Sequence, residues 1–222
     1  LDTAEFDLKA IATRQGAAET AMASAAAALT AKRGAAAERL GRAVTRLLPQ
    51  LGLAGGRLVA VLTPLGEPTS LGAELVQLNV QLNVGIDARP LARVASGGEL
   101  SRIMLALKVV LARHDAVPTL VFDEVDQGIG GEVGAQVGSA LAQVAERHQV
   151  LIITHLPQIA ARADQHLVVS KQARDGMATS DVNVIHGEDR VLELARMLGD
   201  AEGAAARKHA EALLGREPAR RR

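Results

Sequence analysis

The sequence contains no cysteine, no tryptophan and no tyrosine, and it has only two phenylalanines among its 222 residues. The lack of cysteine excludes disulfide bonds and thiolate metal sites, and it is compatible with a reducing cytoplasm. Hydrophobic residues nevertheless make up 48% of the chain, which is enough to build a core. Because aromatic side chains are so scarce, we expect that core to be aliphatic.

An excess of charge of either sign is also lacking, since 25 basic residues balance 25 acidic residues. The composition therefore carries no global electrostatic footprint of a nucleic-acid binder, and any DNA contact must be local or lie elsewhere. No apolar run approaches the roughly 20 residues that cross a bilayer. Residues 1–7 are acidic, lack the pattern of a secretory signal and do not begin with Met, so we interpret the chain as a piece of a longer protein.

Residues 1–48 contain no proline and many alanines, a composition that favours helix. Apolar residues recur there at an approximate heptad spacing: Leu8, Ile11, Ala18, Met22, Ala25 and Leu29, then Leu40, Val44, Leu47 and Leu51. We expect one or two helices from the end of a coiled-coil arm, with Gly16 or Gly34 as possible breaks. An ordinary helical layer on the domain is the alternative.

From residue 49 onward the pattern changes to that of a mixed α/β domain, so we place the domain boundary between 48 and 49. Alternation predicts an antiparallel pair of strands at 57–63 and 75–84, joined by residues 64–72. Short continuous apolar runs at 118–124 and 149–155 predict strands buried on both faces of a parallel sheet. The remaining elements are expected as helices near 100–114, 133–144, 156–163, 191–198 and 204–214, and as strands at 166–171 and 182–186.

The first of these helices has a predicted buried stripe of Leu100, Ile103, Met104, Leu107, Val110 and Leu111. A turn of small residues, Ser96-Gly97-Gly98, precedes it. The first N–H groups of a helix lack partners within the helix, and its dipole places partial positive charge at that end. Two glycines and a hydroxyl would suit the approach of an oxyanion such as phosphate. A simple Ser cap on a flexible turn remains the alternative.

Polar residues end both apolar strands. Asp123 and Glu124 follow the first strand, Asp126 lies in the glycine-rich loop after it, and His155 ends the second strand. The carboxyl ends of parallel strands lie at one edge of a sheet, and open α/β sheets bind ligands at that edge. We therefore expect these four side chains to lie there. An acidic loop and an ordinary loop histidine are the alternatives.

Taken in order, these motifs resemble those of the ATP-binding-cassette ATPases. Ser96-Gly97-Gly98-Glu99 matches the signature motif, residues 120–124 look like Walker B, Asp126 falls at the D-loop aspartate, and His155 matches the switch histidine. Residues 91–102, 122–129, 154–160 and 163–171 resemble more closely the RecN family, bacterial double-strand-break repair ATPases related to SMC proteins. The resemblance implies the C-terminal half of an SMC-like ATPase head that follows the returning arm of a coiled coil.

The resemblance also implies ATP and Mg²⁺ as cofactors and a role for each motif residue. Asp123 would hold Mg²⁺ through its water shell, and Glu124 would act as general base. His155 would contact the γ-phosphate, and Ser96-Gly97-Gly98-Glu99 would act on the nucleotide of a second head. The implied partners are the N-terminal half of the same protein, a second copy in an ATP-sandwiched homodimer, and DNA bound by the intact protein. The implied location is the cytoplasm, at the nucleoid and away from membranes.

One motif of such ATPases is absent from this sequence. None of the five lysines follows a glycine, so the chain contains no G-x-x-x-x-G-K-[ST] phosphate loop. We therefore expect the chain alone to be inactive and to require its N-terminal half. Two other functions remain open, the nucleotide-binding subunit of a membrane transporter and a structural clamp that does not hydrolyse ATP.

Overall fold

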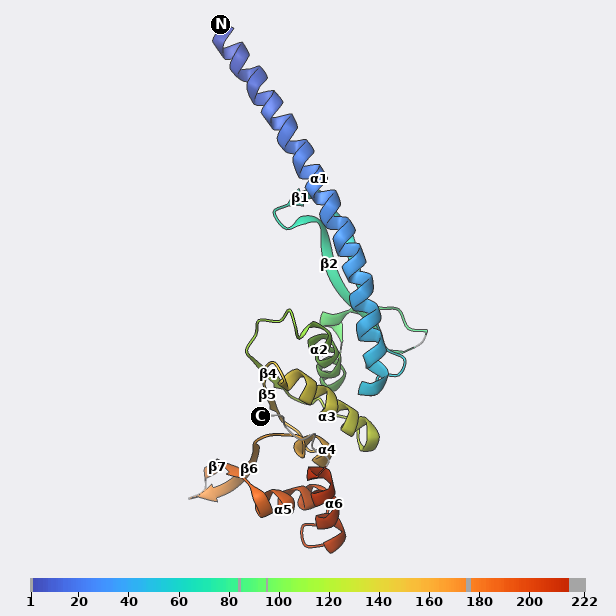
Figure 1. The fold of residues 1–222 in the computed structure, drawn as a ribbon, viewed down its shortest axis with the longest axis vertical. Coiled ribbons are helices and arrows are strands. Elements are labelled where there is room, and N and C mark those ends of the chain that lie inside the picture. Colours follow the sequence, from blue (N-terminus) through green and yellow to red (C-terminus); the bar gives the residue numbers. More distant parts are fainter. Residues whose placement is uncertain (1, 84, 95, 175–176, 216–222) are drawn as a thin grey trace. The chain divides into compact units, whose positions relative to one another are not determined.

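The structure, a computed structural model, describes residues 2–83, 85–94, 96–174 and 177–215 (Figure 1). They form two compact units, one of residues up to 46 with 55–93, the other of 47–54 with the described residues from 94 onward. Residues 55–93 therefore group with the N-terminal helix, whereas the sequence suggested a boundary at residue 48. The assignment of 1–48 to an arm and of 49–222 to a head remains a prediction.

The first unit begins with one uninterrupted helix, α1 (Asp2–Leu47). Neither Gly16 nor Gly34 breaks it, and a Cβ at either position would meet no atom within 4 Å. Glycine costs about 1 kcal/mol relative to alanine within a helix, which the alanine-rich neighbours tolerate. The first two positions of the expected heptad pattern are exposed, since Leu8 and Ile11 are 66% and 59% accessible.

An antiparallel hairpin, β1 (Arg57–Thr69) and β2 (Gly72–Gln81), completes most of this unit. The strands extend into the expected 64–72 connection, with a register shift between Pro64 and Thr69. The end of the second predicted strand, Val84, lies outside the described residues. The short strand β3 (Arg89–Pro90) pairs with β2, and the 3-10 turn η2 (Leu91–Arg93) follows it.

The hairpin is joined to α1 by polar and close backbone contacts. Arg33 forms an ion pair with Glu74 at 3.0 Å and donates to the Leu71 carbonyl at 2.6 Å. Nearer the end of the helix, a Cβ at Gly41 would lie 3.0 Å from the Leu58 carbonyl oxygen. The backbone N–H of Leu58 donates to the Thr45 hydroxyl at 3.1 Å. Gly41 therefore allows the helix and the strand to approach closely.

The second unit contains the helices α2 (Gly97–Leu111) and α3 (Gly131–Ala145), with the 3-10 helix η1 (Leu48–Leu51) packed against both. The sequence predicted that Met104 and Leu111 lie on the buried stripe of α2, but they are 36% and 38% exposed. The buried face of α2 is rotated relative to that expectation. It consists of Gly98, Arg102, Ile103, Leu105, Ala106 and Leu107.

Parallel pairing of the two apolar strands is confirmed. β4 (Thr119–Phe122) pairs with β5 (Gln149–Ile152) in a two-stranded parallel sheet. The prediction that both faces are buried is wrong for the described chain, since Val121 is 66% and Leu151 46% exposed. The hydrogen bond from Ile153 N to Phe122 O, at 3.0 Å, extends the ladder beyond the strands.

The remaining elements form a helical cluster and a second hairpin. The helices are α4 (Pro157–Ala160), α5 (Gly187–Met197) and α6 (Ala204–Leu214), and α5 and α6 lie side by side (Figure 1). They share a small aliphatic core of Ala160, Ala161, Leu194, Ala195 and Ala210. The strands β6 (His166–Arg174) and β7 (Met177–Ile185) pair in antiparallel register. The basic tail, residues 220–222, lies outside the described residues.

We predict that the rotated face of α2 determines which leucine is important for stability. Leu105 is fully buried, whereas Leu111 on the same helix is 38% exposed. Leu105→Ala should lower the free energy of unfolding by about 2–5 kcal/mol, because it leaves a cavity in the core. The same substitution at Leu111 serves as the control and should have a clearly smaller effect. Urea denaturation of the chain measures both, and equal losses would contradict this packing.

Candidate functional site

The N-terminus of α2 is capped by the predicted signature turn. Ser96 is the N-cap, and its hydroxyl accepts a hydrogen bond from the backbone N–H of Glu99 at 3.4 Å. The backbone N–H of Gly98 donates to Oε1 of Gln127 at 3.3 Å. Ala95, part of the sequence motif, lies outside the described residues. The Ser cap is therefore present, and the turn also contacts the loop that follows β4.

Both glycines of this turn lie close to that loop, and Gly98 is the one whose replacement would meet atoms that cannot rotate away. A Cβ at Gly97 would collide with the carboxylate of Glu124. A Cβ at Gly98 would lie 2.9 Å from Cβ of Gln127 and 3.1 Å from the Glu124 carbonyl oxygen. The signature turn and the carboxylate of the Walker B segment, well separated in the sequence, therefore lie in contact within one chain.

The loop after β4 holds Asp123 and Glu124 at the carboxyl end of that strand, and both are exposed. Oδ1 of Asp123 accepts from the backbone N–H of Glu124 at 2.9 Å. Glu124 has a φ of 55° and is the one non-glycine residue in the described chain with positive φ. This left-handed conformation costs about 1–3 kcal/mol and persists where the surroundings enforce it.

Asp126 connects this loop to the segment after β5. It is 3% exposed, and its Oδ2 accepts from the Thr154 hydroxyl at 2.5 Å and from the His155 backbone N–H at 2.8 Å. Nδ1 of His155 lies 3.0 Å from the same oxygen. A carboxylate facing Nδ1 favours the tautomer with its proton there. Nε2 is then the ring nitrogen left to meet a ligand, and the His155 side chain is 70% exposed.

Sequence reasoning missed four residues of this arrangement. Arg102 donates to two carbonyls of the loop, Ser101 donates to the Asp123 carbonyl, Gln127 accepts from Gly98, and Thr154 donates to Asp126. Arg102 could have been noticed, because it lies one turn before the buried Leu105 and Ala106 on the same helix face. The other three carry no such pattern.

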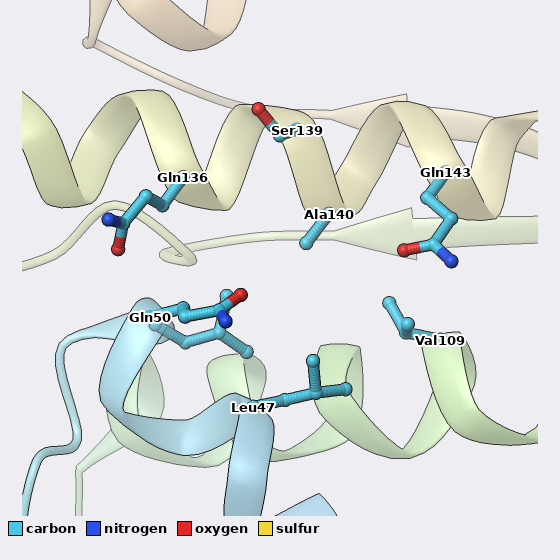
Figure 2. A pocket seen from close by; sticks show the side chains of 8 residues that line it. Leu47, Gln50, Val109, Gln136, Ser139, Ala140 and Gln143 are labelled. Carbon is cyan, nitrogen blue, oxygen red and sulfur yellow. The ribbon is translucent and has the colours of Figure 1, made fainter.

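Few other places in the described residues could serve as a site. They contain no cluster of three His, Asp or Glu side chains that could hold a metal by itself. A hollow lies between α3, η1 and α2, where Gln136 lies across from Gln50 and Gln143 across from Val109 (Figure 2). None of the predicted nucleotide-site residues lines it. No helix in the described part of the chain is long and apolar enough to span a membrane.

The fold resembles that of a solved ATPase head segment. The crystal structure of the Smc head domain with a coiled coil and joint from Pyrococcus yayanosii matches with a TM-score of 0.51 and 23% sequence identity. The match covers 76% of this chain and 29% of that chain. No protein-family model matches the sequence. The fold is therefore that of part of an SMC-type ATPase head.

Curated sequence relatives show which family of SMC-like proteins the chain is similar to. The DNA repair protein RecN of Mycobacterium leprae is 51% identical over 162 residues, which cover 71% of this chain and 27% of that protein. RecN of Mycobacterium bovis is 41% identical over 235 aligned residues, covering 96% of this chain and 40% of that protein. The chain is homologous to the C-terminal region of RecN. It spans about a quarter to two fifths of the length of these relatives.

We predict that Asp126 is the main local anchor of the segment 154–156. Asp126→Ala leaves the Thr154 hydroxyl and the His155 N–H without their acceptor and should cost about 1–3 kcal/mol of stability. Glu146→Ala, which removes an exposed carboxylate at the end of α3, is the control and should change stability by less than about 0.5 kcal/mol. Urea unfolding measures both, and an Asp126→Ala variant as stable as the control would contradict the anchor.

Proposed function

We propose that this chain is the C-terminal head portion of an SMC-like ATPase that acts in DNA double-strand-break repair and recombination. The observation that carries the proposal is the convergence of three separate motifs. Gly97 contacts Glu124, and Asp126 binds the segment that holds His155. The RecN relatives support the setting in DNA repair, since that is what their names state.

Each motif residue has a chemical role in this proposal. Asp123 is exposed at the end of β4, and its Oδ1 is taken by the Glu124 N–H, so Oδ2 is the oxygen available to a hydrated cation. Mg²⁺ in nucleotide sites is bound by one or two carboxylates, with waters and phosphates as the other ligands. A single aspartate therefore fits an Mg²⁺ bound together with ATP, and the ion would neutralise charge on the phosphates.

Glu124 orients and deprotonates the attacking water, and His155 presents Nε2 to the γ-phosphate. The turn Ser96-Gly97-Gly98-Glu99 offers the Ser96 hydroxyl and the Gly97 N–H to the γ-phosphate of a nucleotide held by a second head, while the N–H groups of Gly98 and Glu99 donate within the chain. Asp126 keeps His155 in its orientation. The proposed partner is a second copy of the protein, with ATP between the two heads.

The exposed sheet supports completion by another part of the protein. In the described chain β4 and β5 form a sheet of only two parallel strands, and Val121, Leu151 and Ile153 are 66%, 46% and 62% exposed. Parallel sheets are stable when both faces are covered and more strands are present. The N-terminal half of the same protein is the proposed cover, and it also supplies the phosphate loop that this sequence lacks.

DNA is the proposed binding partner of the intact protein rather than of this chain. The sequence is electrically neutral, and affinity for the phosphate backbone comes mainly from basic side chains. The proposed location is the cytoplasm, in association with the nucleoid. The curated RecN relatives do not favour a transporter subunit, since each is named a DNA repair protein.

The proposed function can be tested by completing the site with the N-terminal half of the protein. The chain alone should not hydrolyse ATP, because it has no phosphate loop, whereas coexpression with its N-terminal half should give Mg²⁺-dependent hydrolysis. Phosphate release with and without EDTA measures this. As a control, an N-terminal half whose phosphate-loop lysine is replaced by alanine should restore nothing. Hydrolysis by the chain alone, or none by the combined halves, would contradict the proposal.

The role of Glu124 in hydrolysis can be tested in the completed protein. Glu124→Gln should lower kcat by about 100-fold or more while ATP still binds, so ATP-bound dimers should accumulate on size-exclusion chromatography. Glu132→Gln, at an exposed position in the first turn of α3, is the matched control and should behave like the unmodified protein. Unchanged hydrolysis by Glu124→Gln would remove Glu124 from the reaction.

A further inference from the structure

A buried arginine connects the signature helix to the loop that carries Glu124 and Asp126. Arg102 lies on α2, six residues after the N-cap Ser96, and is 5% exposed. Its Nη1 donates to the carbonyl of Gln127 at 2.8 Å and to the carbonyl of Val125 at 3.4 Å. These two carbonyls flank Asp126. The charged group therefore contacts the backbone of the loop rather than any side chain in it.

Two further hydrogen bonds from α2 hold the same loop. The Ser101 hydroxyl donates to the Asp123 carbonyl at 2.9 Å, and the Gly98 N–H donates to Gln127 Oε1 at 3.3 Å. Together with Arg102, they fix the loop before Glu124 and on both sides of Asp126. Such surrounding contacts are what allows Glu124 to keep its positive φ of 55°.

The contacts continue from the loop to the switch histidine. Asp126 accepts from the His155 backbone N–H at 2.8 Å and from the Thr154 hydroxyl at 2.5 Å. A displacement of the loop therefore moves the carboxylate that orients His155. Glu124 and His155, the two groups proposed to act on water and on the γ-phosphate, share one support on α2.

Stability alone does not account for an arginine at this position. Burial lowers the pKa of Arg102, and only the carboxylates of Glu99 and Asp126 raise it. Its Nε, among the described residues, is buried without a hydrogen-bond partner. An apolar side chain of similar volume commonly replaces a buried charge without loss of stability. What an apolar residue cannot do is donate hydrogen bonds to the carbonyls of Val125 and Gln127, both of which accept from Nη1 of Arg102.

We propose that Arg102 is a positioning residue for ATP hydrolysis, which fixes Glu124 and His155 of its own head through the loop 123–127. This rests on the function proposed above. It gives the signature helix a second role: its N-terminal turn faces the nucleotide of the partner head, while its next turn orders the hydrolytic groups of its own head.

The experiment compares Arg102→Lys and Arg102→Met in the complete protein, which joins this chain to its N-terminal half. Lysine keeps the charge, but its ammonium nitrogen lies on a shorter side chain than Nη1 of arginine, and methionine keeps the apolar stem without the charge or any donor. Lys108→Met is the matched control, because Lys108 lies on the same helix and forms an ion pair with Asp115 away from the loop.

The expected result is a graded loss of kcat. A misplacement of about 1 Å can cost on the order of 100-fold in rate, so we expect about a tenfold loss for lysine and a larger loss for methionine. KM for ATP should be unchanged, because Arg102 touches no nucleotide. Lys108→Met should keep the kcat of the unmodified protein, with all rates expressed per folded head.

Hydrogen exchange of the same proteins gives a second readout that needs no turnover. The amides of Gln127, Ile129 and His155 are bonded within the loop or to Asp126. They should exchange faster in Arg102→Lys than in the unmodified protein or in Lys108→Met. If the unmodified protein does not hydrolyse ATP, the proposed function fails, and the exchange data still test the coupling.

Two results would overturn the positioning role. One is a kcat per folded head that stays at the unmodified level in Arg102→Lys. The other is unchanged exchange of the three amides in that variant. If Arg102→Met does not fold, Arg102→Lys alone decides between these outcomes.

Discussion

The arrangement of this site depends on one buried carboxylate. Oδ2 of Asp126 accepts from the Thr154 hydroxyl and the His155 backbone N–H and lies 3.0 Å from the His155 ring. A buried carboxylate is costly unless donors surround it, and here the donors come from the segment after the neighbouring strand. This interaction turns two adjacent strand ends into one site, because it fixes the loop after β4 relative to the segment after β5.

The same loop is held from its other side by α2. The helix donates through Ser101 and Arg102 to backbone carbonyls, and its two glycines leave the space that Glu124 and Gln127 occupy. The signature turn is thus shaped by its own chain as well as suited to an anion. This explains in physical terms why position 98 is glycine, since a Cβ there would meet Gln127 Cβ and the Glu124 carbonyl oxygen.

Much of the site could be predicted from the sequence, because motif residues follow strands whose apolar runs are easy to recognise. Parallel pairing of β4 with β5 placed Asp123, Glu124, Asp126 and His155 at one edge. The contacts of Arg102 and Ser101 could not be predicted, since they are made to carbonyls that every residue carries. Of the stripe predicted for α2, Ile103 and Leu107 are buried, but Met104 and Leu111 are not, and the prediction omitted the buried Arg102 because it is charged.

The sequence also could not predict which faces of the sheet are covered within this chain. An apolar strand indicates that both faces are buried somewhere, but it does not indicate which part of a protein buries them, and Val121 and Leu151 are exposed in this chain. Likewise, Gly16 and Gly34 were plausible breaks, and α1 continues through both. Helix propensity summed over many alanines outweighs two isolated glycines.

The most direct test of the account is a structure of the complete protein with Mg²⁺ and a non-hydrolysable ATP analogue. The account predicts two heads with two nucleotides at their shared interface, where Ser96 and Gly97 of one head contact the γ-phosphate bound by the other. Asp123 should face the Mg²⁺ shell, and His155 should face the γ-phosphate of its own head. A nucleotide bound away from these residues, or contacted by the signature turn of its own head, would contradict the account.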